Sequence, residues 1–127
     1  MTQAELFVGP SGLHGRGVFA GRDFLEGDVL EDCPVLVLAP GDLSELGQTT
    51  LSGHLFDWED GGALALGHTS LLNHSFEPNA AYEMDYERMR ITVHALRPIA
   101  SGEEITINYG GAPDARGDLW FETRGAT

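Results

Sequence analysis

Glycine and proline interrupt this chain so often that a long regular element has little room to form. The 127 residues include 17 glycines and 6 prolines, which divide the apolar residues into short runs. Residues 5–8, 17–20, 51–58 and 63–66 each read as a short strand between turn residues. No segment has the sustained periodicity of a long amphipathic helix, and residues 42–46 are predicted to form one helical turn. This pattern favours a mostly β domain.

The clearest strand signal lies between residues 80 and 95. Bulky or apolar side chains occupy every second position in residues 80–86 and again in residues 91–95. Residues 85–88 lie between the two runs and are predicted to form a hairpin turn. Residues 35–38 are apolar without alternation, which predicts a strand buried on both faces. A last strand is expected to place Ile105, Ile107 and Tyr109 on one face.

Length and composition limit the classes of protein that this chain can be. A chain of 127 residues fits one domain, and its 42% content of hydrophobic residues is enough for a core. The N-terminus has no basic region followed by a long apolar run, and the longest apolar run, residues 33–40, is too short to cross a membrane. The lone cysteine, Cys33, excludes an internal disulfide and fits a reducing compartment. We therefore expect a cytoplasmic, non-secreted protein that does not bind membranes.

The charge balance is strongly acidic. Seven basic residues against 20 acidic ones give a net charge of −13 at pH 7. Such a surface repels phosphate backbones, so direct binding of nucleic acid is not expected. The acidity either attracts a basic, lysine-rich protein partner or serves only to keep a small protein soluble. The five histidines show neither the i, i+4 spacing nor the carboxylate clustering of a zinc site, so no metal site is predicted.

Three short blocks carry the candidate functional residues. They read Gly-Leu-His-Gly-Arg-Gly over residues 12–17, Asn-His-Ser-Phe-Glu-Pro-Asn over residues 73–79, and Gly-Glu-Glu-Ile-Thr-Ile-Asn-Tyr over residues 102–109. Closely spaced glycines let a backbone approach a ligand, although they also form ordinary turns. An adjacent Asn and His can hydrogen-bond an adenine edge or an amino acid, although the pair is also common in turns. Glu103 and Glu104 should face opposite sides of a strand, so they are expected to be structural instead of a catalytic carboxylate pair.

Together these blocks resemble the SET-domain protein lysine methyltransferases, and in particular the small stand-alone SET domains of bacteria and of a chlorella virus. The resemblance spans about residues 9–110 in the family's order. It implies a mostly β, β-clip fold of several small sheets with few short helices, in which the Asn-His segment is threaded in a knot-like arrangement beside the last tyrosine. It implies one SET domain over residues 1–127, with a core of about residues 5–110. The implied activity is S-adenosylmethionine-dependent methylation of a lysine in a basic, histone-like protein segment.

The resemblance also implies a role for each block. It implies contacts with S-adenosyl-L-methionine for residues of the first two blocks: His14, Gly15, Arg16, Gly17, Asn73 and His74. It makes Tyr109 the catalytic tyrosine. A phenol has a pKa of about 10, so its hydroxyl is expected to orient the lysine amine and not to act as the base. Ser75 and Asn79 are expected to hold the loop in shape, because both residue types bond readily to nearby backbone.

The substrate channel is where this chain departs most from the family pattern. The implied channel residues are His54, Phe56, Leu72 and Tyr109. The family often has aromatic residues where His54, His68 and Leu72 stand, so the channel's shape and the number of methyl groups added are left open. The two histidines could instead be partly buried polar residues without a role. The altered channel also suits a catalytically inactive module that binds a basic peptide, and a third alternative is a β domain that binds another ligand.

The C-terminal segment, residues 111–127, has several interpretations. Many larger SET enzymes end in a cysteine-rich zinc cluster that helps close the active site, and a chain with one cysteine cannot build such a site. Trp120 and Phe121 follow a Gly-Ala-Pro-Asp-Ala-Arg-Gly run. They are predicted to anchor the tail on the domain or to form a lid in which Trp120 stacks on the adenine. A contact in a homodimer is the third alternative, since the viral relative is a dimer.

Overall fold

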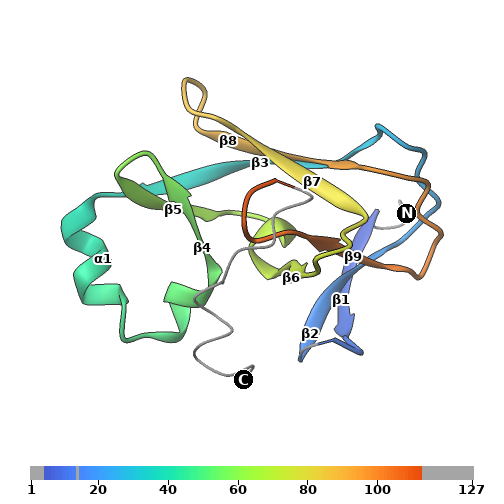
Figure 1. Ribbon diagram of the computed structural model, residues 1–127, viewed down its shortest axis with the longest axis horizontal. Helices are drawn as coiled ribbons and strands as arrows, with labels where there is room; N and C mark the ends of the chain where they lie inside the picture. Colours follow the sequence, from blue (N-terminus) through green and yellow to red (C-terminus); the bar gives the residue numbers. More distant parts are fainter. Residues whose placement is uncertain (1–4, 14, 113–127) are drawn as a thin grey trace.

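The computed structural model describes residues 5–13 and 15–112, which fold mainly into β-strands (Figure 1). In chain order the elements are β1 (Leu6–Pro10), β2 (Arg16–Ala20), β3 (Val29–Leu38), α1 (Pro40–Leu46), the 3₁₀ helix η1 (Thr50–His54), β4 (Leu55–Trp58), β5 (Gly61–Ala65), the 3₁₀ helix η2 (His68–Leu71), β6 (Asn73–His74), β7 (Ala80–Asp85), β8 (Arg90–Ala95) and β9 (Glu104–Ile107). Within these residues the strands form a four-stranded sheet, β1-β2-β9-β6, and a five-stranded sheet, β4-β5-β3-β8-β7. The predicted mostly β fold with few short helices is confirmed. None of the described helices has the length and apolar character needed to span a membrane.

Strands β6 and β9 lie at the centre of this arrangement. In Figure 1 the β1–β2 hairpin lies at one end of the domain and α1 at the other, with β6 and β9 between them. β6 runs parallel to β9, with Asn73 opposite Thr106 and His74 opposite Ile107. The other pairs of described strands are antiparallel. The Asn-His block is therefore a direct neighbour of the strand that leads to Tyr109, although the two are far apart in the sequence.

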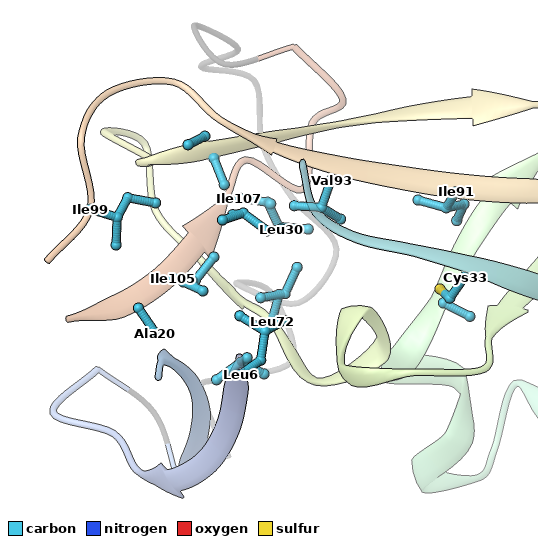
Figure 2. Close-up of a cluster of buried hydrophobic side chains, with 14 of the residues drawn as sticks. Leu6, Ala20, Leu30, Cys33, Leu72, Ile91, Val93, Ile99, Ile105 and Ile107 are labelled. Atoms are coloured by element: carbon cyan, nitrogen blue, oxygen red, sulfur yellow. The ribbon is translucent and has the colours of Figure 1, made fainter. Parts of the chain in front are cut away.

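The hydrophobic core holds β9 in place from both sheets. Ile105 and Ile107 of β9 are both 0% exposed. Figure 2 shows Ile107 gathered with Leu30 of β3 and Val93 of β8, and Leu72 lying among the same cluster of buried side chains. Complete burial of an aliphatic side chain contributes about 1.5–3 kcal/mol to folding. The residues that follow β9 are therefore positioned by a strand that is itself firmly anchored.

Strand β3 corrects the prediction for residues 35–38. This run was expected to be buried on both faces, but Leu36 is 53% exposed and Val37 is 40% exposed. β3 pairs with β8 as far as Pro34 and with β5 from Val35 onward. The proline, which has no N–H to donate, thus lies where the strand changes partner. A run of apolar residues does not report which of its faces another layer will cover, and here the outer half of β3 leaves the core.

The other predicted strands agree with the structure except at their ends. β7 and β8 form the predicted hairpin, with Ala80 opposite Ala95 and Asp85 opposite Arg90. The predicted strand over residues 51–58 is wrong in its first half, because Thr50–His54 forms η1. Ser52 there donates its hydroxyl to the carbonyl of Thr49, a local bond that favours a turn over a strand. The last strand ends at Ile107, so Tyr109 lies beyond it and not on its face.

Asn79 fastens the segment after β6 to β9. Its side chain is almost fully buried, at 3% exposed for the residue. Its Nδ2 donates to the carbonyl of Glu104 at 2.8 Å, and its Oδ1 accepts from the backbone N–H of Thr106 at 2.9 Å. Ser75, in contrast, uses its hydroxyl to accept from the backbone N–H of Glu77 in an exposed turn. Both residues therefore bond to backbone as expected, but Asn79 does so inside the core.

Replacing Asn79 with alanine is expected to lower the free energy of unfolding by about 2 kcal/mol, because buried backbone groups of β9 would lose their partners. Urea unfolding followed by circular dichroism measures this change. Ser75→Ala is the control, and its exposed bond should be worth less than about 0.5 kcal/mol. If the two variants lost similar amounts of unfolding free energy, the buried hydrogen bonds of Asn79 to β9 would not have the importance assigned to them.

Candidate active site

A pocket of about 410 Å³ opens beside Tyr109. The predicted channel residues all line it: His54, Phe56, Leu72 and Tyr109. They come from three separate parts of the chain, namely the junction of η1 with β4, the residue after η2, and the turn after β9. The structure therefore brings together around one cavity the side chains that the sequence analysis grouped as a channel.

Tyr109 is tied to the Asn-His segment by two hydrogen bonds. Its hydroxyl donates to the carbonyl of Leu72 at 2.5 Å, and its backbone N–H donates to Nδ1 of His74 at 3.0 Å. The ring centroids of His74 and Tyr109 are 5.3 Å apart. Burial, with a smaller contribution from the negative charge of Glu104, raises the pKa of Tyr109 to about 12. The phenol is therefore neutral near pH 7 and cannot serve as a base there.

His74 acts on Tyr109 through its ring. Because Nδ1 accepts the backbone N–H of Tyr109, the neutral imidazole carries its proton on Nε2. The ring also packs edge-on against Phe76, with 4.4 Å between centroids. Nδ1 is thus already used within the protein, and a ligand contact by His74 would have to come from another part of the residue.

A second cluster joins the glycine block to β6 and β9. Nδ2 of Asn73 donates to the carbonyl of Arg16 and to Oε2 of Glu104, both at 2.9 Å. Oγ of Ser11 lies 2.7 Å from Oε1 of the same carboxylate and accepts the backbone N–H of Leu13. The carboxylate of Glu104 therefore holds the loop between β1 and β2 against the Asn-His segment. Glu104 was predicted to be structural, but this contact was not predicted from the sequence, because it depends on the pairing of strands distant in the chain.

Gly17 is glycine because Glu104 occupies the space beside it. A Cβ at this position would collide with the carboxylate of Glu104 and would come within 3.1 Å of Nδ2 of Asn73. Gly15, in contrast, adopts a positive φ of 50°, which a residue with a Cβ rarely adopts. At Gly17, therefore, the group that comes close to the backbone is the side-chain carboxylate of Glu104.

His68 lies outside the pocket and belongs to an anchor for η2. Its Nδ1 lies 3.0 Å from Oε2 of Glu31 on β3, while the backbone N–H and hydroxyl of Thr69 donate to Oε1 at 2.8 and 2.7 Å. Burial alone would raise the pKa of Glu31, but the hydrogen bonds from Thr69 and His68 outweigh it and lower the pKa. Glu31 thus fixes η2, the segment that leads directly to the carbonyl of Leu72.

One wall of the pocket was not foreseen as part of a site. Tyr82, Met84 and Tyr86 line it from β7 and the residue just after it. Tyr82 packs edge-on against Phe56 at 5.0 Å between centroids, and burial together with the charge of Asp57 raises the pKa of Tyr82. Their alternation on one strand face was visible in the sequence. Nothing local showed that this face would meet Tyr109.

Two predicted cofactor contacts, His14 and Trp120, lie outside the described residues, as do Phe121 and the rest of the tail from residue 113. Within residues 5–13 and 15–112, no three His, Cys, Asp or Glu side chains converge in the manner of a metal site. Of the predicted contacts that are described, Gly15 lies in the loop before β2, Arg16 and Gly17 begin β2, and Asn73 and His74 form β6, the last strand in the order of its sheet.

The family described as the SET domain matches residues 15–110. A histone-lysine N-methyltransferase of Schizosaccharomyces pombe, specific for H3 lysine-37, is 36% identical over 110 residues, which cover 85% of this chain and 71% of that protein. A proposed histone methyltransferase of Plasmodium falciparum has a TM-score of 0.67 at 26% identity, covering 94% of this chain and 99% of the other.

A more distant likeness supports the fold. Polycomb Repressive Complex 2 of Chaetomium thermophilum, in a structure bound to S-adenosylmethionine, contains a chain that matches with a TM-score of 0.71 at 24% identity. The match covers 87% of this chain but 15% of the other chain, so it reports a shared domain. The predicted family, fold and enzyme class are confirmed by these comparisons together. The chain belongs to the SET domain family of protein lysine methyltransferases.

Proposed function

We propose that this chain transfers the methyl group of S-adenosylmethionine to a lysine side chain in a basic segment of a protein substrate. The observation that carries the proposal is Tyr109, a partly buried and neutral phenol beside a pocket of about 410 Å³, hydrogen-bonded to the segment that contains Asn73 and His74. The inactive peptide-binding module is the alternative that the first experiment below excludes or supports.

We propose that Tyr109 orients the substrate amine. Its hydroxyl proton is committed to the carbonyl of Leu72, so its oxygen can offer lone pairs to an N–H of the substrate amine or to a polarised methyl group. When bound, S-adenosylmethionine supplies an activated methyl group on a positively charged sulfur. Holding the amine in line with that methyl group at about 3–3.5 Å accounts for much of the lowering of the barrier. The pocket walls contributed by Phe56, Leu72 and Tyr82 keep water from surrounding the amine.

We assign the cofactor to the side of Tyr109 formed by the glycine block and β6. In the described part of the sheet β6 is an edge strand, so one side of its backbone faces away from β9 and suits the donor and acceptor edge of an adenine. The loop before β2 is already fixed by Glu104, which favours binding without a large ordering cost. Gly15, Arg16, Gly17, Asn73 and His74 are the proposed contacts. His14 and Trp120 remain proposed from the resemblance.

The acidic charge supports a basic substrate. The net charge of −13 and an exposed Asp57 on the pocket wall favour approach of a cationic segment, and added salt should weaken that approach. The relative from Schizosaccharomyces pombe acts on a histone. We therefore propose a histone-like basic protein as the substrate of this chain. A cytoplasmic location and a homodimer stay predictions.

Methyl transfer tests the proposal directly. Purified protein with methyl-labelled S-adenosylmethionine and a mixture of core histones is expected to incorporate label, and Tyr109→Phe should reduce the rate by about 100-fold with little change in cofactor binding. Tyr86→Phe, which removes a hydroxyl from the exposed part of the pocket wall, should cost less than about threefold. Cofactor binding by the wild type without transfer to any histone or other basic protein would support the inactive module instead.

The ionisation of Tyr109 gives a second prediction, on stability. Its folded-state pKa of about 12 lies above the ordinary value of about 10, so folding favours the protonated phenol. The resulting stabilisation is complete below about pH 10 and is lost as the pH rises through about 12. Tyr109→Phe should therefore lose less stability than the wild type between about pH 10 and about pH 12 in urea unfolding. An identical alkaline decline in both proteins would contradict the shift.

Adjacent carboxylates provide a matched pair for testing the cofactor side. Glu104 holds Ser11 and Asn73, whereas Glu103 bonds to Arg97 and to the backbone N–H of Ala100. Glu104→Ala is expected to weaken binding of S-adenosylmethionine by about tenfold, because the loop would have to order on binding. Glu103→Ala should change the affinity by less than about threefold. Isothermal calorimetry measures both affinities, and equal effects would argue against Glu104 as the support of the cofactor loop.

A further inference from the structure

The backbone fixes the tautomer of neutral His54. Its Nδ1 lies 2.8 Å from the carbonyl oxygen of Ser70. A carbonyl oxygen can only accept a hydrogen bond, so Nδ1 must be the donor. In the neutral imidazole the lone pair then resides on Nε2, at the edge of the ring away from Ser70. The structure therefore presents a side-chain nitrogen that can accept a proton.

His54 lines the same cavity as Tyr109. His54 and Tyr109 both line the pocket, and they are anchored on the same short segment, His54 on the carbonyl of Ser70 and Tyr109 on the carbonyl of Leu72. Two residues of chain span at most about 7 Å between Cα atoms, so the two anchors are close in space. Glu31 fixes the segment from the other side through Thr69. The imidazole and the phenol are thus parts of one rigid arrangement.

The other titratable groups of the pocket are poorly suited to take a proton near neutral pH. Tyr109, whose pKa is raised to about 12, and Tyr82, whose pKa is also raised, are protonated there. Asp57 is an exposed carboxylate. Tyr86 is an exposed phenol. Among the described residues that line the pocket, His54 is the one imidazole that an entering lysine ammonium would meet.

The surrounding charges do not compete for His54. Asp42 and Glu45 of α1, the helix packed against η1, are both exposed to solvent. His68 of η2 is directed to Glu31. Among the described residues that line the pocket, Asp57 bears the one formal negative charge, and it would favour a positive charge developing in the cavity.

We propose that His54 is the proton acceptor that converts the substrate lysine from ammonium to free amine before methyl transfer, a role that rests on the function proposed above. The N–H bond of the ammonium breaks as a bond from hydrogen to Nε2 of His54 forms. The electron pair left on the lysine nitrogen then forms the bond to the methyl carbon, and the pair of the breaking carbon–sulfur bond goes to sulfur. The imidazolium returns its proton to water at the open side of the pocket.

The test compares pH–rate profiles for methyl transfer to core histones. His54→Ala is expected to lower kcat/KM at about pH 7 by about 100-fold, the range of a positioned general base. The deficit should shrink to about threefold near pH 10, because a free lysine amine loses its proton there without help. Added imidazole should restore the rate of His54→Ala at about pH 7 by about tenfold, since the small base can enter the space that the side chain vacates.

His94→Ala is the matched control, because His94 lies on β8 and is not among the pocket-lining residues. Its pH profile should follow the wild type, and imidazole should have no effect on it. A His54→Ala deficit that is constant with pH and is not relieved by imidazole would overturn the role of His54 while leaving the methyltransferase assignment intact. Absence of transfer by the wild type would overturn both.

A measurement without turnover adds an independent check. Long-range ¹H–¹⁵N correlation spectra of labelled protein report which ring nitrogen of each neutral histidine carries the proton, and His54→Ala identifies the signals of His54. We expect a protonated Nδ1 and an unprotonated Nε2. The opposite tautomer would overturn the proposal even if the variant were inactive.

Discussion

The parallel pairing of β6 with β9 is the contact on which the rest of the site depends. It sets Asn73 and His74 beside the strand whose buried isoleucines anchor it in the core. The turn after β9 then has no freedom to carry Tyr109 elsewhere, because both its N–H and its hydroxyl bond back to the segment around β6. Parallel strands cannot be joined by a tight turn, so this pairing requires the long excursion through β7 and β8. That excursion in turn supplies a wall of the pocket.

Two partly buried carboxylates hold the segments on either side of Tyr109. Glu31 receives hydrogen bonds from η2 and fixes the pocket side, whereas Glu104 receives them from Ser11 and Asn73 and fixes the glycine loop. The chain has a net charge of −13, and most of its acidic residues contribute to a negative surface. Glu31 and Glu104 instead accept hydrogen bonds from the protein's own side chains and backbone. A buried carboxylate is tolerated because several donors compensate for its lost hydration.

Neighbouring elements contribute to the pocket that His54 and Leu72 line. Leu72 contributes a carbonyl to Tyr109 as well as an apolar side chain, so its identity matters less than its backbone position. Aromatic surface comes instead from Tyr82 and Tyr86, which belong to the hairpin and not to the motif blocks. A change in one motif position therefore does not by itself report the loss of a channel, because the walls come from several strands.

Local sequence was sufficient for features that depend on neighbouring residues. The alternation over residues 80–95 predicted a hairpin, and the motif blocks singled out Tyr109, Asn73 and His74 before any contact was known. Local sequence could not predict contacts between strands that are distant in the chain. The partnership of Glu104 with Asn73, the use of Glu31 to fix η2, and the wall formed by Tyr82 all depend on a register that local propensity does not encode. The apolar run containing Leu36 and Val37 was misjudged for the same reason, since periodicity reports a side chain's character and only tertiary packing decides which face is covered.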